Sequence, residues 1–379
     1  MPPFGKVWAL ITHGEWASTF EDIAYRRTGL SLRARLNIVL QNLSHALRWP
    51  ISFAIPYYLT VEPASICNLQ CPVCPCGLHK TIRNPAILPL ADFKRLIDDI
   101  GEYLVLIQMW EWGEPFMNPD ICEMIAYARS RGIVVICSTN CHFFEEEAVV
   151  RKLVDSGLDG LILAVDGATP EVYEKYRVGG DFRRVLAGIQ RIVAEKERRG
   201  SAKPLLHLRM VINAFNESQI EAFKELGETL QVDQVAFKTI NAGMGGESKN
   251  PGILPQDKNL IRKKKARHFQ YRCLVSWCNP VLFSNGRIGL CGLACRGETE
   301  LRATSDAASF FHVWNSREAR TFRKNIRADC NHYPFCRECD CREPDFQRAR
   351  FGVEKVARRM PSQPTGSQPG RGPGNGGRR

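Results

Sequence analysis

The chain has 379 residues, of which 44% are hydrophobic and 24% charged, with 30 glycines and 22 prolines. These proportions exclude collagen-like, coiled-coil and wholly disordered chains, and the length suffices for one large core or two domains. Lysine and arginine exceed aspartate and glutamate by 52 to 40, giving a net charge of +12. No apolar run reaches the roughly 18 residues of a membrane-spanning helix, and the first residues lack a signal-peptide pattern, so we expect a cytoplasmic protein.

Residues 1–55 are predicted to form an N-terminal helical segment. Leucines recur there at helical spacing, which predicts an amphipathic helix: Leu32, Leu36, Leu40, Leu43 and Leu47. Such a stripe is explained by packing of the helix on the main domain. It is also explained by peripheral contact of a basic helix with a membrane surface. The sequence leaves both explanations open.

Residues 56–242 alternate between strand and helix patterns. Strands are predicted at 58–63, 104–110, 133–139, 160–167, 205–212 and 234–240. Helices are predicted at 92–100, 119–131, 145–156, 181–199 and 218–230. This succession predicts an α/β fold, with a parallel sheet covered by crossover helices. Periodicity does not decide whether the sheet closes into a barrel, but functional sites are expected at the carboxyl ends of its strands.

The distribution of the fifteen cysteines divides the rest of the chain. Seven lie at or before Cys141 and eight lie from Cys273 to Cys341, with none between. Disulfides are rare in a reducing compartment, so this clustering indicates metal. We expect a basic linker at 243–272, a small cysteine-rich domain at 273–355 and a disordered tail, rich in glycine and proline, at 356–379.

The first cysteine cluster follows the first predicted strand directly. Cys67, Cys71 and Cys74 have the spacing C-x3-C-x2-C. Three thiolates suit a [4Fe–4S] cluster, and with three protein ligands one iron stays open for another molecule. The alternative is a zinc site completed by Cys76 or His79.

This motif, CNLQCPVC in a β/α loop, resembles the radical S-adenosylmethionine (radical SAM) superfamily. The resemblance extends over residues 58–240 and implies a partial (β/α)6 TIM-like barrel. It also implies that Cys67, Cys71 and Cys74 hold the cluster, whose open iron chelates S-adenosylmethionine. One electron would then cleave the cofactor to a 5′-deoxyadenosyl radical, which abstracts hydrogen from the substrate.

Further motifs match the same family at later strand ends. Trp112-Gly113-Glu114-Pro115 resembles the family's GGEP motif, with Trp112 in place of the first glycine. The resemblance implies that Glu114 holds the amino group of the cofactor's methionine. The full set of cofactor-binding residues that it implies is Gly113, Glu114, Ser138, Asn140, Asp166 and Arg177.

The second cysteine cluster resembles a twitch or SPASM auxiliary-cluster domain. Asn285-Gly286 has the pattern of a hairpin turn, and the strand after it leads to Cys291. The resemblance implies that one auxiliary [4Fe–4S] cluster is held by Cys273, Cys291, Cys336 and Cys339. A second auxiliary cluster or a zinc ribbon is the alternative use of the remaining four: Cys278, Cys295, Cys330 and Cys341.

These motifs are compatible with three functions. The first is a radical SAM enzyme that dehydrogenates or epimerises a small molecule such as a sugar or nucleoside, with flavodoxin or ferredoxin as electron donor. The second is a SPASM-type peptide-modifying maturase. The prediction of helices alone for residues 1–55 favours the first, because many maturases begin with a winged-helix module. The third, a non-catalytic metal-containing nucleic-acid binder, rests on the basic run at 262–267, where solvated linker charge is the simpler explanation, so we expect no specific nucleic acid.

Cys141 is the candidate catalytic residue that separates epimerisation from dehydrogenation. It follows Ser138-Thr139-Asn140 at the end of a predicted strand, where relatives commonly have glycine. A thiol facing the reaction chamber could return a hydrogen atom to a substrate radical and invert a stereocentre. The alternative is that Cys141 is a small buried hydrophobic residue.

Overall fold

The computed structural model describes residues 4–78, 83–240, 251–261, 273, 275–292, 294, 296–303, 309–329, 331–337 and 350–356. The predicted linker at 243–272 is therefore described only at 251–261, and the predicted tail only at its first residue. The basic run at 262–267 lies outside the described residues, as do His79, Cys295, Cys330, Cys339 and Cys341. No helix in the described ranges is long and apolar enough to cross a membrane.

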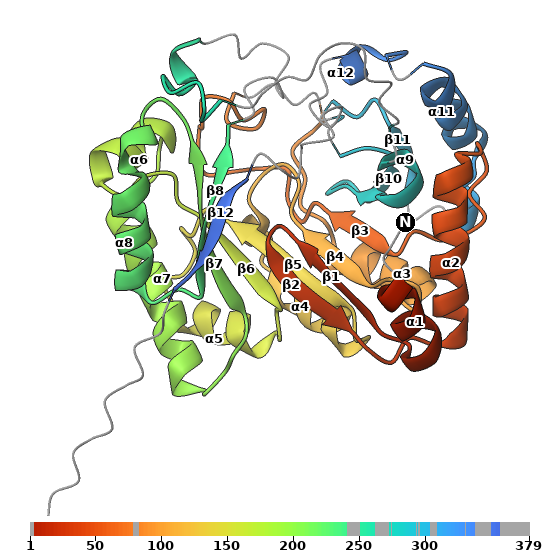
Figure 1. The fold of residues 1–379 in the computed structure, drawn as a ribbon, viewed down its shortest axis with the longest axis horizontal. Coiled ribbons are helices and arrows are strands. Elements are labelled where there is room, and N and C mark those ends of the chain that lie inside the picture. The colour runs from red at the N-terminus through yellow and green to blue at the C-terminus, as the bar shows by residue number, and fades with distance from the viewer. Residues whose placement is uncertain are drawn as a thin grey trace, which may run out of the picture.

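Six parallel strands form the centre of the molecule (Figure 1). They are β3 (Tyr58–Val61), β4 (Leu106–Met109), β5 (Val134–Thr139), β6 (Gly160–Ala164), β7 (Leu205–Ile212) and β8 (Gln234–Thr239). The helices between them are α3 (Leu90–Ile100), α4 (Ile121–Ser130), α5 (Glu147–Asp155), α6 (Pro170–Tyr176), α7 (Phe182–Arg198) and α8 (Ile220–Leu230), with single 3-10 turns at Pro115–Met117 and Glu217–Gln219. The predicted α/β class and the partial barrel are confirmed.

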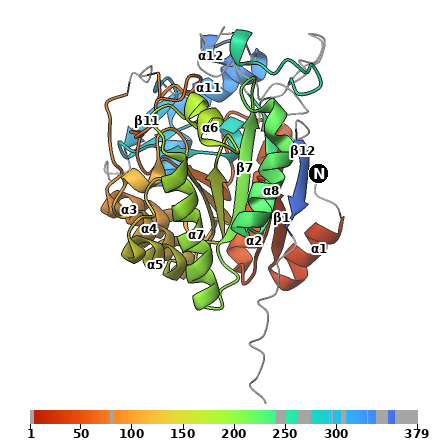
Figure 2. The same ribbon diagram turned by 90° about the vertical axis from the view of Figure 1, so that its left-hand side faces the viewer.

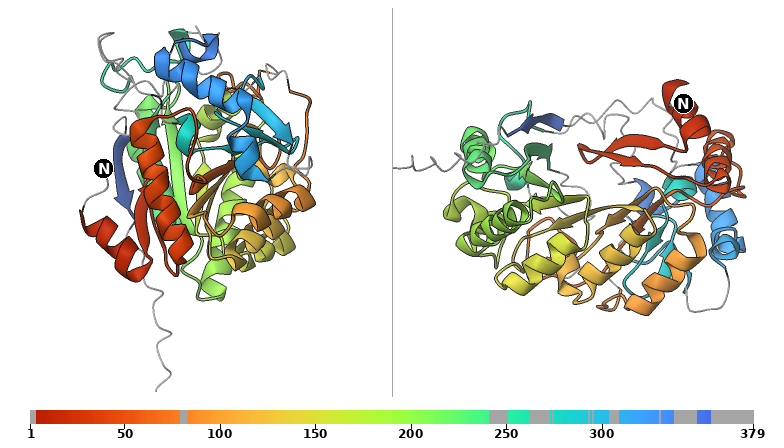
Figure 3. Two further views of the ribbon diagram at one scale, coloured as in Figure 1. Left: turned by 90° about the vertical axis from the view of Figure 1, so that its right-hand side faces the viewer. Right: turned by 90° about the horizontal axis from the view of Figure 1, so that it is seen from below.

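The alternation of side chains along the strands explains why helices cover only one side of this sheet. Ile107, Val135 and Leu161 point to the outer side and pack on apolar faces of the helices, such as Leu96 and Ile97 of α3. Successive side chains of a strand point to opposite faces, so Leu106, Val134 and Ile162 point inward, where they belong to a second apolar cluster. The curved sheet, with its helices outside, is seen from below in Figure 3.

C-terminal elements extend both edges of the sheet. The strand order is β11-β10-β9-β3-β4-β5-β6-β7-β8-β12. Strand β9 (Val281–Leu282) pairs parallel with β3, and β10 (Arg287–Gly289) and β11 (Glu300–Ala303) follow it in antiparallel pairing. Strand β12 (Arg350–Lys355) pairs antiparallel with β8 at the opposite edge (Figure 1), and Figure 2 shows β12 beside α8 at that edge. The cysteine-rich region thus continues the sheet of the preceding domain.

Short helices accompany these C-terminal strands. They are the 3-10 turn Pro251–Ile253, α9 (Val275–Cys278), α10 (Phe310–Trp314), α11 (Arg317–Ala328) and α12 (Pro334–Arg337). Helix α11 is capped at its N-terminus by Ser316, whose hydroxyl accepts a hydrogen bond from Ala319 N at 3.2 Å. Its buried Arg323 lies over the Trp314 ring, 4.4 Å from the centroid. These contacts join α10 and α11 into one unit.

The prediction of helices alone for residues 1–55 is wrong. Helices α1 (Phe4–His13) and α2 (Leu32–Leu47) are separated by an antiparallel hairpin of β1 (Trp16–Phe20) and β2 (Ile23–Arg27). Its turn residues Glu21 and Asp22 have φ angles of 50° and 67°. Such turns usually contain Asn-Gly or Asp-Gly, so Glu-Asp gave no hairpin signal in the sequence.

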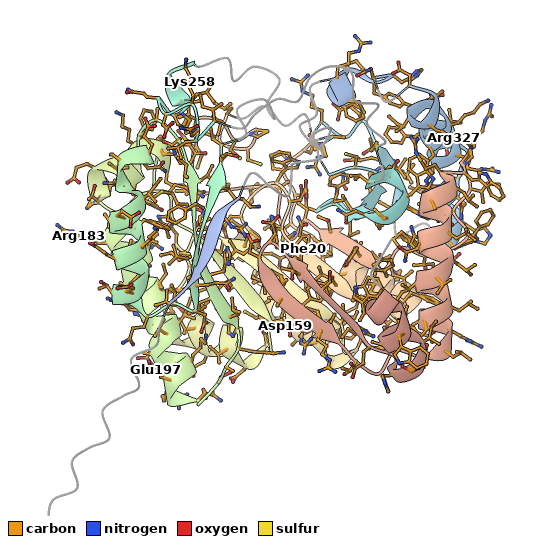
Figure 4. The ribbon with its side chains drawn as sticks, in the orientation of Figure 1. Phe20, Asp159, Arg183, Glu197, Lys258 and Arg327 are labelled. Atoms are coloured by element: carbon orange, nitrogen blue, oxygen red, sulfur yellow. The ribbon has the colours of Figure 1, made fainter. Side chains whose placement is uncertain are left out.

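This hairpin lies against the inner side of the sheet (Figure 3). A Cβ atom added at Gly160 of β6 would lie only 2.8 Å from Ile23 Cδ1, so the hairpin contacts the strand backbone closely. Phe20, labelled in Figure 4 at the end of β1, has its ring centroid 6.0 Å from that of Trp110. The hairpin therefore fills part of the space that the curved sheet encloses.

Candidate functional site

The first cysteine loop leaves β3 at its carboxyl end and is held by its own backbone. Cys74 N donates to Cys71 O at 3.2 Å, and Leu69 N donates to Cys67 Sγ at 3.4 Å. Cys71 is buried, Cys67 and Cys74 are half-buried, and all three are free thiols. Three thiols in one short loop beside a strand end are the arrangement that the C-x3-C-x2-C spacing predicts.

Electrostatic effects act differently on the three thiols. Burial raises the pKa of Cys67 to about 11. The hydrogen bond with Cys76 lowers the pKa of Cys74 to about 6. Cys67 also experiences the charges of Cys71 and Cys74, so the three are neighbours. Even so, within the described ranges no three potential ligands lie in a geometry ready for a metal ion. The ligand assignment therefore stays a prediction.

Arg177 and Asp166 lie beside the same loop. Arg177 Nε donates to Asp166 Oδ2 at 2.6 Å, and Arg177 Nη1 reaches Cys71 Sγ at 3.8 Å. Asp166, after the end of β6, also accepts a hydrogen bond from Val211 N at 2.6 Å. Two predicted cofactor-binding residues and one predicted ligand are thus linked across three strand ends. The guanidinium supplies positive charge next to a thiol that would be a thiolate.

Glu114 is a second buried carboxyl at this edge of the sheet, beside Asp166. Its Oε1 accepts hydrogen bonds from Thr139 Oγ1 at 2.8 Å and Phe116 N at 3.1 Å. Its Oε2 accepts one from Asn140 N at 2.8 Å. Burial raises the pKa of Glu114 to about 7, although these hydrogen bonds lower it. A carboxyl so placed is costly as an anion until a cation binds beside it.

Gly113 brings two backbone segments into close contact. Its φ angle is 86°, and an added Cβ atom would lie 2.3 Å from Ala64 O. Only glycine fits there without moving the backbone that leads to Cys67. Trp112, which replaces the first glycine of the motif, donates from Nε1 to Gly292 O at 2.8 Å. The turn before Glu114 is therefore attached to the residue that directly follows Cys291.

Two further predicted residues come from the end of β5. Asn140 Nδ2 donates to Asn68 Oδ1 at 2.8 Å and reaches Cys67 Sγ at 3.8 Å. Ser138 is half-buried, and the alternation along β5 places it on the inner side of the sheet. The structure thus brings Gly113, Glu114, Asn140, Asp166 and Arg177 to the first cysteine loop, with Ser138 on the same strand end.

The expectation that Cys141 faces a reaction chamber needs correction. Its side chain is fully buried and belongs to the apolar core between sheet and helices. The thiol reaches Thr139 O at 3.6 Å, and the residue has a φ of 69°. The backbone turns sharply after β5 and directs this side chain away from the inner face. The alternative, a small buried hydrophobic residue, describes it better.

The structure describes only part of the second cysteine cluster. Cys273 and Cys336 both pack against the main apolar core, and Cys291 follows β10. Cys278, in α9, has a pKa raised to about 12 by burial and by the neighbouring Cys273. Cys339 lies outside the described residues, so the predicted set of four auxiliary ligands stays a prediction.

Sequence reasoning missed two acidic residues near these sites, one buried and one half-buried. Glu62, fully buried, forms a two-pronged ion pair with Arg83 at 2.8 and 2.7 Å and accepts from Ser284 Oγ at 2.8 Å. Glu111 directly precedes Trp112 and would touch any Cβ atom at Gly292. Burial and the charge of Glu62 raise the pKa of Glu111 to about 8. Neither residue belongs to a motif, and only their positions just beyond apolar strand patterns marked them.

An α/β partial barrel with a three-cysteine loop after its first parallel strand defines the class of domain to which residues 61–227 belong. Residues 61–227 match the family model of the Radical SAM superfamily. This part of the chain is a radical SAM domain. Members of this family use a [4Fe–4S] cluster and S-adenosylmethionine, and the residues described above fit both, with thiols for the cluster and a buried carboxyl for a cationic group.

Comparison with known proteins finds relatives of several activities. The chain is 31% identical to Fe-coproporphyrin III synthase of Methanosarcina barkeri over 189 residues, which are 49% of this chain and 45% of that protein. It is 29% identical to mycofactocin maturase MftC of Mycobacterium tuberculosis over 184 residues, 48% and 45% of the two chains. The chain thus matches less than half the length of either relative.

A solved structure shares the fold over a larger part of the chain. Streptococcus suis SuiB bound to its precursor peptide SuiA has a TM-score of 0.57 and 14% identity, covering 89% of this chain and 81% of that chain. At this identity the likeness shows the fold alone. It extends well beyond residues 61–227.

Proposed function

We propose that the protein is a radical SAM enzyme that abstracts hydrogen from a small-molecule substrate. The observation that supports this most is the hydrogen-bonded set Glu114, Asn140, Asp166 and Arg177 around the loop of Cys67, Cys71 and Cys74. When bound, the cluster and S-adenosylmethionine supply a 5′-deoxyadenosyl radical. The chain's own residues bind and orient these groups.

Each predicted residue then has a definite role. Cys67, Cys71 and Cys74 hold the cluster, and Arg177 balances the negative charge near Cys71. Glu114, a buried carboxyl with a raised pKa, accepts hydrogen bonds from the ammonium of the cofactor's methionine. Gly113 keeps the backbone close, while Ser138, Asn140 and Asp166 contact the ribose.

The C-terminal cysteines complete the proposal. Cys273, Cys291, Cys336 and Cys339 hold an auxiliary [4Fe–4S] cluster of the twitch or SPASM type, and flavodoxin or ferredoxin supplies electrons. Cys291 is the residue next to Gly292, whose carbonyl binds Trp112. This contact relates the auxiliary site to the turn that positions Glu114.

Among the reactions, dehydrogenation is favoured over epimerisation through Cys141. The Cys141 thiol is fully buried in the core, so it cannot meet a substrate on the inner side of the sheet. Dehydrogenation needs no such thiol. The 5′-deoxyadenosyl radical would take one hydrogen atom, and the substrate radical would then lose an electron to the auxiliary cluster and a proton to a base, which gives a carbonyl.

A peptide-modifying maturase is the second candidate, favoured by the likeness to MftC and by the SuiB fold. The described N-terminal segment supports the small-molecule proposal, because its hairpin lies within the curve of the sheet rather than forming a separate module. That argument would not hold if a separate protein bound the precursor peptide for the enzyme. Incubation with precursor peptides and with sugars or nucleosides, followed by mass spectrometry, distinguishes the two.

The decisive experiment measures iron and 5′-deoxyadenosine after anaerobic purification. We expect about eight irons per chain from two four-iron clusters, and cleavage of S-adenosylmethionine with dithionite. Replacing Cys67, Cys71 and Cys74 by alanine together should leave about four irons and abolish 5′-deoxyadenosine. Cys122→Ala, a half-buried cysteine of α4, is the matched control and should change neither.

Other outcomes would contradict the proposal in different ways. Stoichiometric zinc without iron would mean that the protein is a metal-containing binding protein and not an enzyme. About twelve irons would indicate that a second auxiliary cluster is present, held by Cys278, Cys295, Cys330 and Cys341. If turnover in deuterated water inverts a carbon and places deuterium on it, the reaction is an epimerisation and not a dehydrogenation.

A further inference from the structure

The exposed hydrophobic side chains of this protein are concentrated in one segment. Among the described residues thirteen large hydrophobic side chains are exposed, and ten of them lie between Trp8 and Phe53. We call these ten the apolar band: Trp8, Ile11, Leu32, Leu36, Val39, Leu43, Leu47, Trp49, Ile51 and Phe53. Exposed apolar side chains gathered in one segment can form an interaction site, whereas single scattered ones are ordinary.

Helix α2 supplies the centre of the band and is oriented with its leucines outward. Leu32, Leu36 and Leu43 are 78%, 58% and 48% exposed. Their spacing of four and seven residues places them on one side of the helix. In the left view of Figure 3, α2 runs along the outside of the molecule. The packing of the leucine stripe on the main domain, which the sequence allowed, does not occur.

The buried side of α2 combines the apolar Ala34 and Ile38 with polar side chains, and the hydrogen bonds of the polar ones fix this orientation. Asn37 donates to Ile55 O at 2.7 Å and accepts from Ile55 N at 2.9 Å. Gln41 donates to Trp277 O, and Ser44 Oγ accepts from Phe53 N at 3.0 Å. Turning the helix to bury its leucines would leave these groups without partners, at a cost for each. The exposure of the band is therefore built into the fold.

Eight of the ten residues of the band, from Leu32 onward, lie in a stretch without acidic residues. From Ile23 to Val61 the sequence contains five arginines and no aspartate or glutamate. Arg33, beside the leucine stripe, is exposed. Two copies meeting through this segment would bring arginines together with no carboxylate of the segment to balance them. The charge instead complements an anionic partner.

Aromatic residues lie at both ends of the band. Trp8 is in α1, whose end is tied to α2 by Arg35 donating to Ile11 O at 2.9 Å. Trp49 and Phe53 follow α2, with ring centroids 5.1 Å apart. Tryptophan is favoured at the boundary between water and lipid. An amphipathic helix with leucines on one side, arginines beside them and flanking tryptophans is typical of a helix that lies in a membrane surface.

We propose that the apolar band binds the surface of an anionic lipid bilayer, with α2 lying parallel to the membrane plane. The leucines enter the acyl boundary, and Arg33 pairs with lipid phosphates. This surface lies outside the cysteine loops, so the proposal does not depend on the proposed enzymatic function. It assigns the protein a peripheral place on a membrane.

Vesicle flotation of the anaerobically purified full-length chain tests the proposal. We expect binding to vesicles of phosphatidylcholine with phosphatidylglycerol and much weaker binding to phosphatidylcholine alone. The double variant Leu36→Gln/Leu43→Gln should bind roughly thirtyfold less tightly. Arg33→Gln should bind about fivefold less tightly to anionic vesicles. Phe311→Gln, which removes an exposed aromatic residue of α10 outside the band, is the matched control and should bind as the unaltered chain does.

Three outcomes would overturn the proposal. One is absence of binding to anionic vesicles, and another is equal binding by the double variant. The third is a dimer in sedimentation velocity that the double variant dissociates, with no vesicle binding, which would make a second copy the occupant. Circular dichroism and iron content, unchanged in the variants, show that any loss comes from the surface and not from unfolding.

Discussion

The two cysteine regions differ in how the chain assembles them. The first occupies one loop after β3, and its partners Glu114, Asn140 and Asp166 come from later strand ends of the same parallel sheet, with Arg177 of the α6 terminus bound to Asp166. The second is spread along the sequence from Cys273 to Cys341, and its described cysteines lie among short strands and helices that follow β8 in the chain. Parallel strands bring their carboxyl ends together by their regular topology, so the first site follows from the fold class. The second depends on individual long-range contacts.

Those contacts can be named. Glu62 at the end of β3 binds Arg83 and Ser284, and Arg83 also lies over the Phe283 ring, 4.1 Å from its centroid. Trp112 binds Gly292 O. Together they attach the C-terminal strands to the loops around the first site. Variants of these contacts and of the first site alone should therefore have separable effects.

The largest expected effect is on stability, through the buried ion pair. Arg83→Met leaves the fully buried Glu62 without its cation, and we expect the free energy of unfolding to fall by about 3–5 kcal/mol. Urea unfolding measures it. Arg95→Met is the control, since Arg95 pairs with Asp92 on the exposed surface of α3 and should cost less than about 1 kcal/mol. Equal losses in both variants would mean that the buried pair does not join the two regions.

The next effect is on cofactor binding at the first site alone. Glu114→Gln removes the charge but keeps the shape, so affinity for S-adenosylmethionine should fall roughly tenfold to hundredfold, with iron content unchanged. Equilibrium dialysis under anaerobic conditions measures this. Glu123→Gln, at an exposed position of α4, is the control.

The pH dependence of binding sharpens the same test. Because the pKa of Glu114 is about 7, most of this carboxyl is protonated at pH 6, and affinity of the unaltered chain should be roughly tenfold weaker there than at pH 8. The Gln variant should lack that difference. If the unaltered chain and the Gln variant showed the same pH dependence of affinity, a group other than Glu114 would be responsible for it.

The smallest effect concerns Glu111, between the two regions. Burial raises its pKa from 4.5 to about 8, so between these values the folded chain holds a proton that the unfolded chain releases. Stability therefore falls as pH rises through this window. Glu111→Gln should flatten the decline and raise Tm at pH 8.5 by about 2 °C. Glu225→Gln, exposed on α8, should keep the original slope, and the same slope in Glu111→Gln would contradict the assignment.

The parts of the molecule that sequence predicted are those set by short-range patterns. The six strands and the helices between them, except α6, follow from hydrophobic periodicity. The positions of Glu114 and Asp166 follow from their places soon after strands, whereas Arg177 lies at the end of the unpredicted α6. The placing of Cys67, Cys71 and Cys74 in one loop needed only their spacing. Their roles as ligands are still to be measured.

The parts that it missed are set by contacts between distant residues. The leucine stripe of α2 predicted an amphipathic helix, but the outward direction of the leucines comes from Asn37 and Gln41 meeting Ile55 and Trp277. Cys141 followed a strand end, yet its positive φ turns it into the core. The raised pKa of Glu111 comes from burial and from Glu62, neither of which its neighbours in sequence reveal.

The late strands that border the sheet have a consequence for synthesis of the protein. While the ribosome extends the chain, β3 and β8 emerge with open edges, because β9 and β12 are made afterwards. Open strand edges invite pairing with other chains. A nascent chain stopped before residue 281 would therefore expose two unpaired strand edges. We expect such a chain to aggregate, or to require a chaperone until β9 and β12 have paired with β3 and β8.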